Sequence, residues 1–108
     1  MSNFDSLVSQ AKQMSTLSNV KVGAALLCKD FSIYSAAEYK FSANNHLPAE
    51  LSALSKALEE KKTKFTALAI YGKDSISADT KQILLKLSDM WVIFANSDSN
   101  KSTTLSKL

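Results

Sequence analysis

Glu50 is the residue of this sequence with the best-defined setting for acid–base chemistry. It lies two residues after Pro48 in HLPAELSALSKAL (46–58), a stretch with the apolar spacing of an amphipathic helix. A carboxylate held at a helix start can move protons when a reacting group lies beside it. The same carboxylate also complements the helix dipole, and proline suits the first helical position. Glu50 is therefore interpreted as a structural residue or a remnant, with ligand binding or unexpected chemistry as the alternatives.

Cys28 and His46 are the two side chains of the sequence that could serve as soft metal ligands. One cysteine excludes an internal disulfide and any Cys-x-x-Cys site. Cys28 falls at the far end of a predicted strand, roughly 20 Å from its start at about 3.3 Å per residue. His46 lies four residues before Glu50, in a predicted loop. The sequence thus predicts no metal site built from these two residues.

Composition is that of an ordinary globular chain. The 108 residues are 45% hydrophobic and 21% charged, with two glycines and one proline, which predicts a single domain spanning 1–108. The net charge of +3 comes from 13 lysines against 10 acidic residues, with no arginine, which argues against nucleic-acid readout. The densest lysine group, 61–64, is interpreted as a solvated helix end, with a phosphate-binding patch as the alternative.

No apolar run approaches the roughly 20 residues that span a bilayer, and the first residues lack a signal-peptide pattern. We therefore expect a cytoplasmic protein with no membrane partner and no nucleic-acid partner.

The elements that would position Glu50 follow from the hydrophobic pattern. It first predicts a helix near 2–15, then a hairpin from VKVGAALLC (20–28) and FSIYSAAEY (31–39), and a polar loop at 40–46. A helix from Pro48 follows, and after it a buried strand FTALAIYG (65–72). The last predicted elements are a helix in DSISADTKQILLKLS (74–88), a buried strand MWVIFA (90–95), and a short edge strand and a stub of helix in the tail. A hairpin followed by helix–strand–helix–strand predicts an α/β fold, a three-layer α/β/α sandwich with a mixed sheet.

The two later helices also carry predicted faces. Ser77 is a plausible N-cap, with Asp79 in the first turn that follows it. The residues predicted to face inward are Leu51, Leu54 and Leu58 in the first of these helices, and Ile83, Leu84 and Leu87 in the second.

Four stretches in one order resemble the small cytidine deaminases. SNVKVGAALL (18–27) is similar to the family's Ser-Asn-Phe-Pro-Val-Gly-Ala-Ala-Leu-Leu, and PAELSALSKAL (48–58) to the helix that begins Cys-Ala-Glu. SISADTKQILLKLS (75–88) falls where the family has Pro-Cys-Gly-Ala-Cys-Arg-Gln, and TTLSKL (103–108) resembles the closing Thr-Leu-x-x-Leu-Leu. The resemblance implies a cytidine deaminase-like fold.

The resemblance does not carry the family's chemistry. There, three cysteine thiolates hold a zinc ion that activates water for attack on cytosine, and a glutamate moves the proton. The three ligand positions correspond here to Pro48, Ser77 and Thr80. Proline offers no ligand atom, and neutral hydroxyls are poor zinc ligands beside thiolate or imidazole. We therefore expect no zinc and no other cofactor.

The family's substrate-binding positions are altered as well. Its base-stacking aromatic corresponds to Val20, and its ribose-binding Asn-x-Glu corresponds to Ala36 through Glu38, which keeps the glutamate and loses the asparagine. The arginine after Cys-Ala-Glu corresponds to Leu51. These positions predict an eroded pocket.

The interpretation we favour is a pseudoenzyme that lacks zinc and deaminase activity and keeps weak nucleoside binding or an assembly role. The alternative is a divergent active deaminase, a hydrolase acting on a C–N amidine bond with Glu50 as proton shuttle. The partners implied by the resemblance are further copies of this chain in a dimer or tetramer, a nucleoside-like ligand, and an intact deaminase subunit.

Overall fold

The computed structural model describes residues 4–42, 46–87, 89–97 and 100–108. Its elements are α1 (Phe4–Ser15), β1 (Gly23–Cys28), β2 (Ile33–Ala37), β3 (Tyr39–Lys40), β4 (His46–Leu47), α2 (Ala49–Glu59), β5 (Phe65–Tyr71), α3 (Ala78–Leu85), β6 (Trp91–Ala95), β7 (Asn100–Thr104) and a 3₁₀ helix (Leu105–Lys107). None of the helices in these ranges is long and apolar enough to cross a bilayer.

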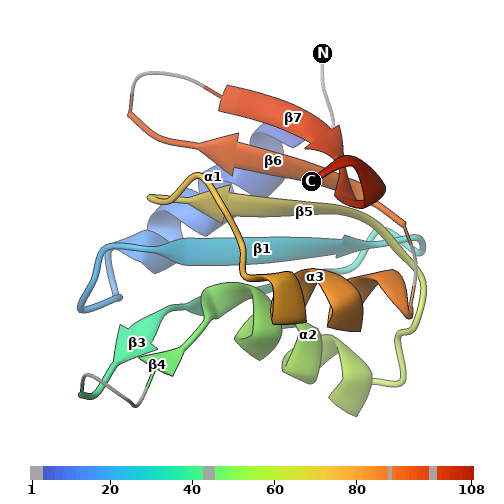
Figure 1. The fold of residues 1–108 in the computed structure, drawn as a ribbon, viewed down its shortest axis with the longest axis horizontal. Coiled ribbons are helices and arrows are strands. Elements are labelled where there is room, and N and C mark those ends of the chain that lie inside the picture. Colours follow the sequence, from blue (N-terminus) through green and yellow to red (C-terminus); the bar gives the residue numbers. More distant parts are fainter. Residues whose placement is uncertain (1–3, 43–45, 88, 98–99) are drawn as a thin grey trace.

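Five strands form one mixed sheet in the order β2-β1-β5-β6-β7 (Figure 1). The predicted hairpin is present, with β1 antiparallel to β2. β1 also pairs antiparallel with β5, β5 runs parallel to β6 through the crossover that contains α3, and β7 closes the far edge antiparallel to β6. The parallel pair places the carboxyl ends of β5 and β6 at the same edge of the sheet.

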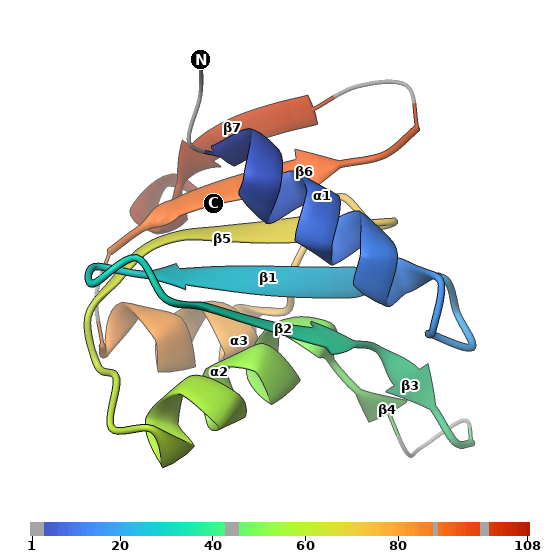
Figure 2. The same ribbon diagram turned by 180° about the vertical axis from the view of Figure 1, so that it is seen from behind.

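Helices cover both faces of this sheet, because side chains alternate between its two sides (Figures 1 and 2). Figure 2 shows α1 across one face, where Leu7 and Ala11 pack among side chains of β1, β5 and β6. α2 and α3 lie against the opposite face, where Leu54 and Leu84 join the larger cluster with Leu26 and Leu68. The predicted three-layer α/β/α sandwich is confirmed.

The buried face of α2 differs from the predicted one. Leu54 is buried and Leu51 is half-buried, but Leu58 is 42% exposed. The face that meets the sheet is instead a line of alanines, namely Ala49, Ala53 and Ala57, with Glu50 beside it. Small side chains at every fourth position allow the helix backbone to approach the strands closely, and this proximity rotates the larger Leu58 outward.

α3 shows a smaller departure of the same kind. Leu84 is buried and Leu87 packs partly against the core, but Ile83 is 43% exposed. The helix is shorter than the stretch 74–88, and its buried line runs from Thr80 to Leu84. Four-residue spacing places these two residues on one side and leaves Ile83 on another.

The predicted polar loop at 40–46 contains a feature that the sequence did not indicate. Tyr39–Lys40 pairs antiparallel with His46–Leu47 in a two-stranded ribbon. Two residues per strand are too few for a periodic pattern, so only the fold reveals the pairing. The ribbon leads the chain from the end of β2 directly into Pro48 and α2.

Candidate functional site

The start of α2 is capped from another part of the chain. Pro48 was predicted as the first helical residue, but it is the N-cap, with an extended backbone at φ −62° and ψ 138° and no side-chain cap bond. The N–H of Ala49 instead donates to Glu38 Oε1 at 3.2 Å. Glu38 follows β2 directly, so a carboxylate from the sheet supplies the acceptor that proline lacks.

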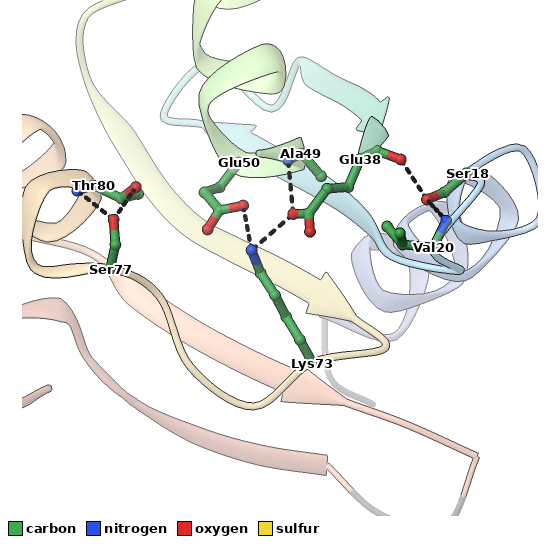
Figure 3. A network of polar contacts seen from close by, with 8 residues as sticks. All are labelled: Ser18, Val20, Glu38, Ala49, Glu50, Lys73, Ser77 and Thr80. Atoms are coloured by element: carbon green, nitrogen blue, oxygen red, sulfur yellow. Dashed lines mark hydrogen bonds and ion pairs between the residues drawn. The ribbon is translucent and has the colours of Figure 1, made fainter. Parts of the chain in front are cut away.

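Glu50 lies in the first turn of α2 and is 1% exposed. The Lys73 ammonium lies 3.1 Å from Glu50 Oε1 and 2.8 Å from Glu38 Oε1 (Figure 3). Two carboxylates, one in α2 and one directly after β2, therefore share one cation, because Lys73 reaches them from the loop after β5. We call this group the Glu38–Lys73–Glu50 cluster.

The loop that carries Lys73 depends on Gly72. Gly72 has φ +100°, a conformation that L side chains rarely adopt, and its N–H donates to the Ala95 carbonyl at 3.0 Å. A methyl group at this position would also collide with the Lys21 carbonyl oxygen. A glycine at the end of β5 therefore allows the chain to turn and direct Lys73 toward the two carboxylates.

Lys73 is charged in this setting. Burial is the largest single influence on it and by itself would lower its pKa. The hydrogen bond to Glu38 and the attraction of Glu50 outweigh burial, so the pKa of Lys73 is raised above its ordinary value. Lys73 is thus the positively charged member of the cluster.

Ser77 and Thr80 form a second polar group at the start of α3. The Ser77 hydroxyl accepts from the Thr80 N–H at 3.1 Å, as predicted for an N-cap, and donates to Thr80 Oγ1 at 2.9 Å. Thr80 is buried. In Figure 3 this pair lies to one side of Glu50 and Lys73 lies to the other.

The residues at the three ligand positions do not fit a zinc ion. Pro48 has no donor atom, the Ser77 and Thr80 hydroxyls are bonded to each other, and the nearby carboxylate Glu50 already binds an ammonium group. Within the described ranges, no group of three or more His, Cys, Asp or Glu side chains is arranged to hold a metal ion.

Cys28 does not join the cluster. Cys28 is buried opposite Phe65, the first residue of β5, whereas Lys73 follows the last residue of that strand. Seven strand residues separate these positions by roughly 20 Å, and burial raises the pKa of the Cys28 thiol. The backbone of His46 lies in β4, and its side chain lies outside the described residues.

The predicted substrate-binding positions divide into two groups. The Ser18 hydroxyl donates to the Glu38 carbonyl and accepts from the Val20 N–H, so Val20 lies beside the Glu38 backbone (Figure 3). Ala36 is buried in the core cluster that α2 covers. The structure thus brings Glu38 together with Glu50 through Lys73, places Val20 beside the Glu38 backbone, and buries Ala36 in the core.

Two hollows flank the loop that carries Lys73. One, of about 260 Å³, is lined by Gly72, Lys73, Asp74 and Asn96. The other, of about 380 Å³, is lined by residues 74–78 with Lys81, Gln82 and Leu108. Neither hollow is lined by Glu38 or Glu50, and Lys73 lines only the smaller one, where it is the member of the cluster that a ligand would meet.

Sequence reasoning did not identify Lys73. It is 35 residues from Glu38 and 23 from Glu50, and no local pattern links such distant positions. One signal was present. A lysine follows a glycine at the carboxyl end of a strand that runs parallel to the next strand, which is where α/β folds gather their binding groups.

No protein-family model and no curated protein sequence matches this chain. Among solved structures, it is similar to cytidine deaminase from Burkholderia pseudomallei, with a TM-score of 0.85 and 21% identity over 99% of this chain and 95% of that one. It is also similar to cytidine deaminases from Mycobacterium tuberculosis (TM-score 0.77, 18% identity, 99% and 94% covered) and Mycobacterium leprae (TM-score 0.77, 15% identity, 99% and 97% covered). The chain therefore has the cytidine deaminase-like fold that its sequence predicted.

Proposed function

We propose that this chain is a pseudoenzyme with the cytidine deaminase fold, which neither holds zinc nor deaminates cytidine. The observation that carries the proposal is the set of donors at the three ligand positions. Pro48 supplies no ligand atom, and the Ser77 and Thr80 hydroxyls satisfy each other. Neutral hydroxyls do not replace thiolates as zinc ligands.

The loss of zinc removes the reagent of the reaction. Deamination in this fold requires an activated water to attack the ring carbon, and a metal lowers the pKa of that water toward 7. Glu50 does not compensate for this loss, since a carboxylate moves protons but does not generate hydroxide by itself. Its contact with Lys73 at 3.1 Å gives it a structural partner that requires no catalysis.

We further propose that the site retains weak binding of a nucleoside-like ligand. The support is the pair of hollows lined by the segment after β5, of which the larger, about 380 Å³, falls in the range of small-molecule pockets. Lys81 and Gln82 line this hollow and offer hydrogen-bond donors. The hollow is formed by the segment between β5 and α3, the start of α3 and Leu108.

The test has two arms on the unmodified chain. The first measures zinc by mass spectrometry after purification without chelator, and we expect far less than one zinc per chain. The second follows cytidine absorbance beside an active cytidine deaminase as positive control, and we expect no turnover. Calorimetric titration with cytidine and uridine should detect binding in the millimolar range, about 4 kcal/mol.

The competing function is a divergent active deaminase that uses Glu50 as proton shuttle. The observation in its favour is the buried position of Glu50 in the first turn of α2. Cytidine turnover that is abolished by Glu50→Gln would establish this function and refute the pseudoenzyme. Stoichiometric zinc that survives dialysis would refute the argument from the ligand positions.

A further inference from the structure

We propose that Lys73 is the resident counter-cation of this site, a positive charge built into the chain that two buried carboxylates require and that makes the site independent of metal. The proposal rests on the proposed loss of zinc and deepens it, because it identifies what neutralises the site instead. It concerns a positioning residue and not a catalytic one.

The geometry of the ammonium group supports this role. Its nitrogen lies 2.8 Å from Glu38 Oε1 and 3.1 Å from Glu50 Oε1, so both oxygens lie within one hydrogen bond of the same point (Figure 3). The carboxylate side chains are 5% and 1% exposed, and that of Lys73 is 24% exposed. The cation therefore covers two groups that water barely reaches.

The charges explain why a cation is needed. Two carboxylates facing one point repel each other, and burying either without a counter-charge is costly. The N–H of Ala49 and the positive end of the α2 dipole favour the Glu38 carboxylate. Lys73 adds one full positive charge at the point that both carboxylate oxygens face.

The chemistry of the site without Lys73 follows directly. Two carboxylate oxygens directed at one vacated point are the donors that hard divalent cations such as Ca²⁺ prefer, with water completing the coordination. Removal of the lysine should therefore turn a metal-independent site into one that takes up Ca²⁺.

The experiment compares Lys73→Met with the unmodified chain by thermal denaturation, with and without millimolar Ca²⁺ at matched ionic strength. Lys73→Met should lower the melting temperature by about 10 °C. Ca²⁺ should recover a measurable part of that loss and should leave the unmodified chain unchanged. Lys101→Met, which removes an exposed lysine on β7, is the matched control. It should change neither the melting temperature nor the response of the melting temperature to Ca²⁺.

A second variant separates charge from packing. In a background with Glu38→Gln and Glu50→Gln, the carboxylates are neutral amides of the same size, so removing Lys73 should shift the melting temperature by less than about 3 °C. An equal loss in both backgrounds would mean that Lys73 contributes packing alone, and would overturn the proposal. If Lys73→Met does not fold, this triple variant must fold for the proposal to stand.

The outcomes distinguish this inference from the proposed function. Zinc content and cytidine turnover of the unmodified chain decide whether it is a pseudoenzyme, and they do not depend on the Lys73 variants. A Ca²⁺ response that is equal in the unmodified chain and in Lys73→Met would refute the counter-cation role and leave the pseudoenzyme proposal unaffected.

Discussion

Three cysteines placed at Pro48, Ser77 and Thr80 in one variant would test whether lost ligands are the only defect of the site. Ser77 is the N-cap of α3, and replacing such a cap costs about 1 kcal/mol. The buried Thr80 hydroxyl bonds to Ser77, and its loss costs about 1 kcal/mol more. Without metal, the variant should therefore be about 2 kcal/mol less stable in urea denaturation, and repulsion among three thiolates would add to this loss.

Zinc should reverse that loss. A ligand present at about 100 times its dissociation constant adds about 2.7 kcal/mol of stability, which exceeds the expected cost. We expect one zinc per chain by mass spectrometry and a zinc-dependent rise in stability. A variant with alanine at the same three positions is the matched control, since it loses the same hydrogen bonds and should not respond to zinc.

The variant should still deaminate cytidine poorly. Val20 provides no ring, Ala36 is buried in the core, and Leu51 cannot moderate thiolate charge. Two or three missing contacts of about 1–3 kcal/mol each would lower the rate by about 10²–10⁵. Turnover at ordinary enzyme rates would show that the pocket is intact. A variant that binds no zinc would refute the alignment of Ser77 and Thr80 with the missing cysteines.

The remaining predictions address stability and assembly. Because the pKa of Lys73 is raised, its ion pairs stabilise the fold fully below the ordinary lysine pKa of 10.5, and this contribution is lost as the pH rises beyond that value. Above pH 10.5, urea denaturation should therefore show a steeper fall in stability for the unmodified chain than for Lys73→Met. Gly72→Ala should cost about 2 kcal/mol or more by the same assay, because φ is +100° and the methyl group meets a backbone oxygen; an unchanged midpoint would contradict this account. We expect a dimer or tetramer by light scattering, since the stacked rings of Tyr39 and Phe41 lie exposed beside Leu47, and a monomer at high micromolar concentration would exclude it.

The sheet and its covering helices were predictable because local patterns determine them. The continuous apolar run 65–72 predicts a strand buried on both faces, and it forms the middle of the sheet as β5. Ser77 was predicted as an N-cap because a hydroxyl at a helix start has a local partner three residues later. Such features depend on neighbours in the sequence.

Features that depend on distant contacts were predicted less well. Leu58 was assigned to the core from its size and spacing, but the close approach of the alanine face to the sheet determines the rotation of α2. The sequence matched Glu38 to a ribose-binding position of the family, but it did not indicate that the carboxylate accepts from Ala49 and Lys73. A pairing across 35 residues leaves no periodic signal, so the central cation of the site was found only in the folded chain.

The bond from Ala49 to Glu38 has a consequence for local opening. Helix ends normally fray, and their first amides exchange hydrogen with water through small, independent fluctuations. Here the acceptor belongs to the residue that follows β2, and the same carboxylate oxygen also binds Lys73. The first turn of α2 can therefore open at Ala49 only when its hydrogen bond to the Glu38 carboxylate breaks. This carboxylate is carried by the residue after β2 and also binds Lys73 in the loop after β5. The Ala49 amide should exchange slowly for a helix terminus, and its exchange rate would report the opening of three segments as one unit.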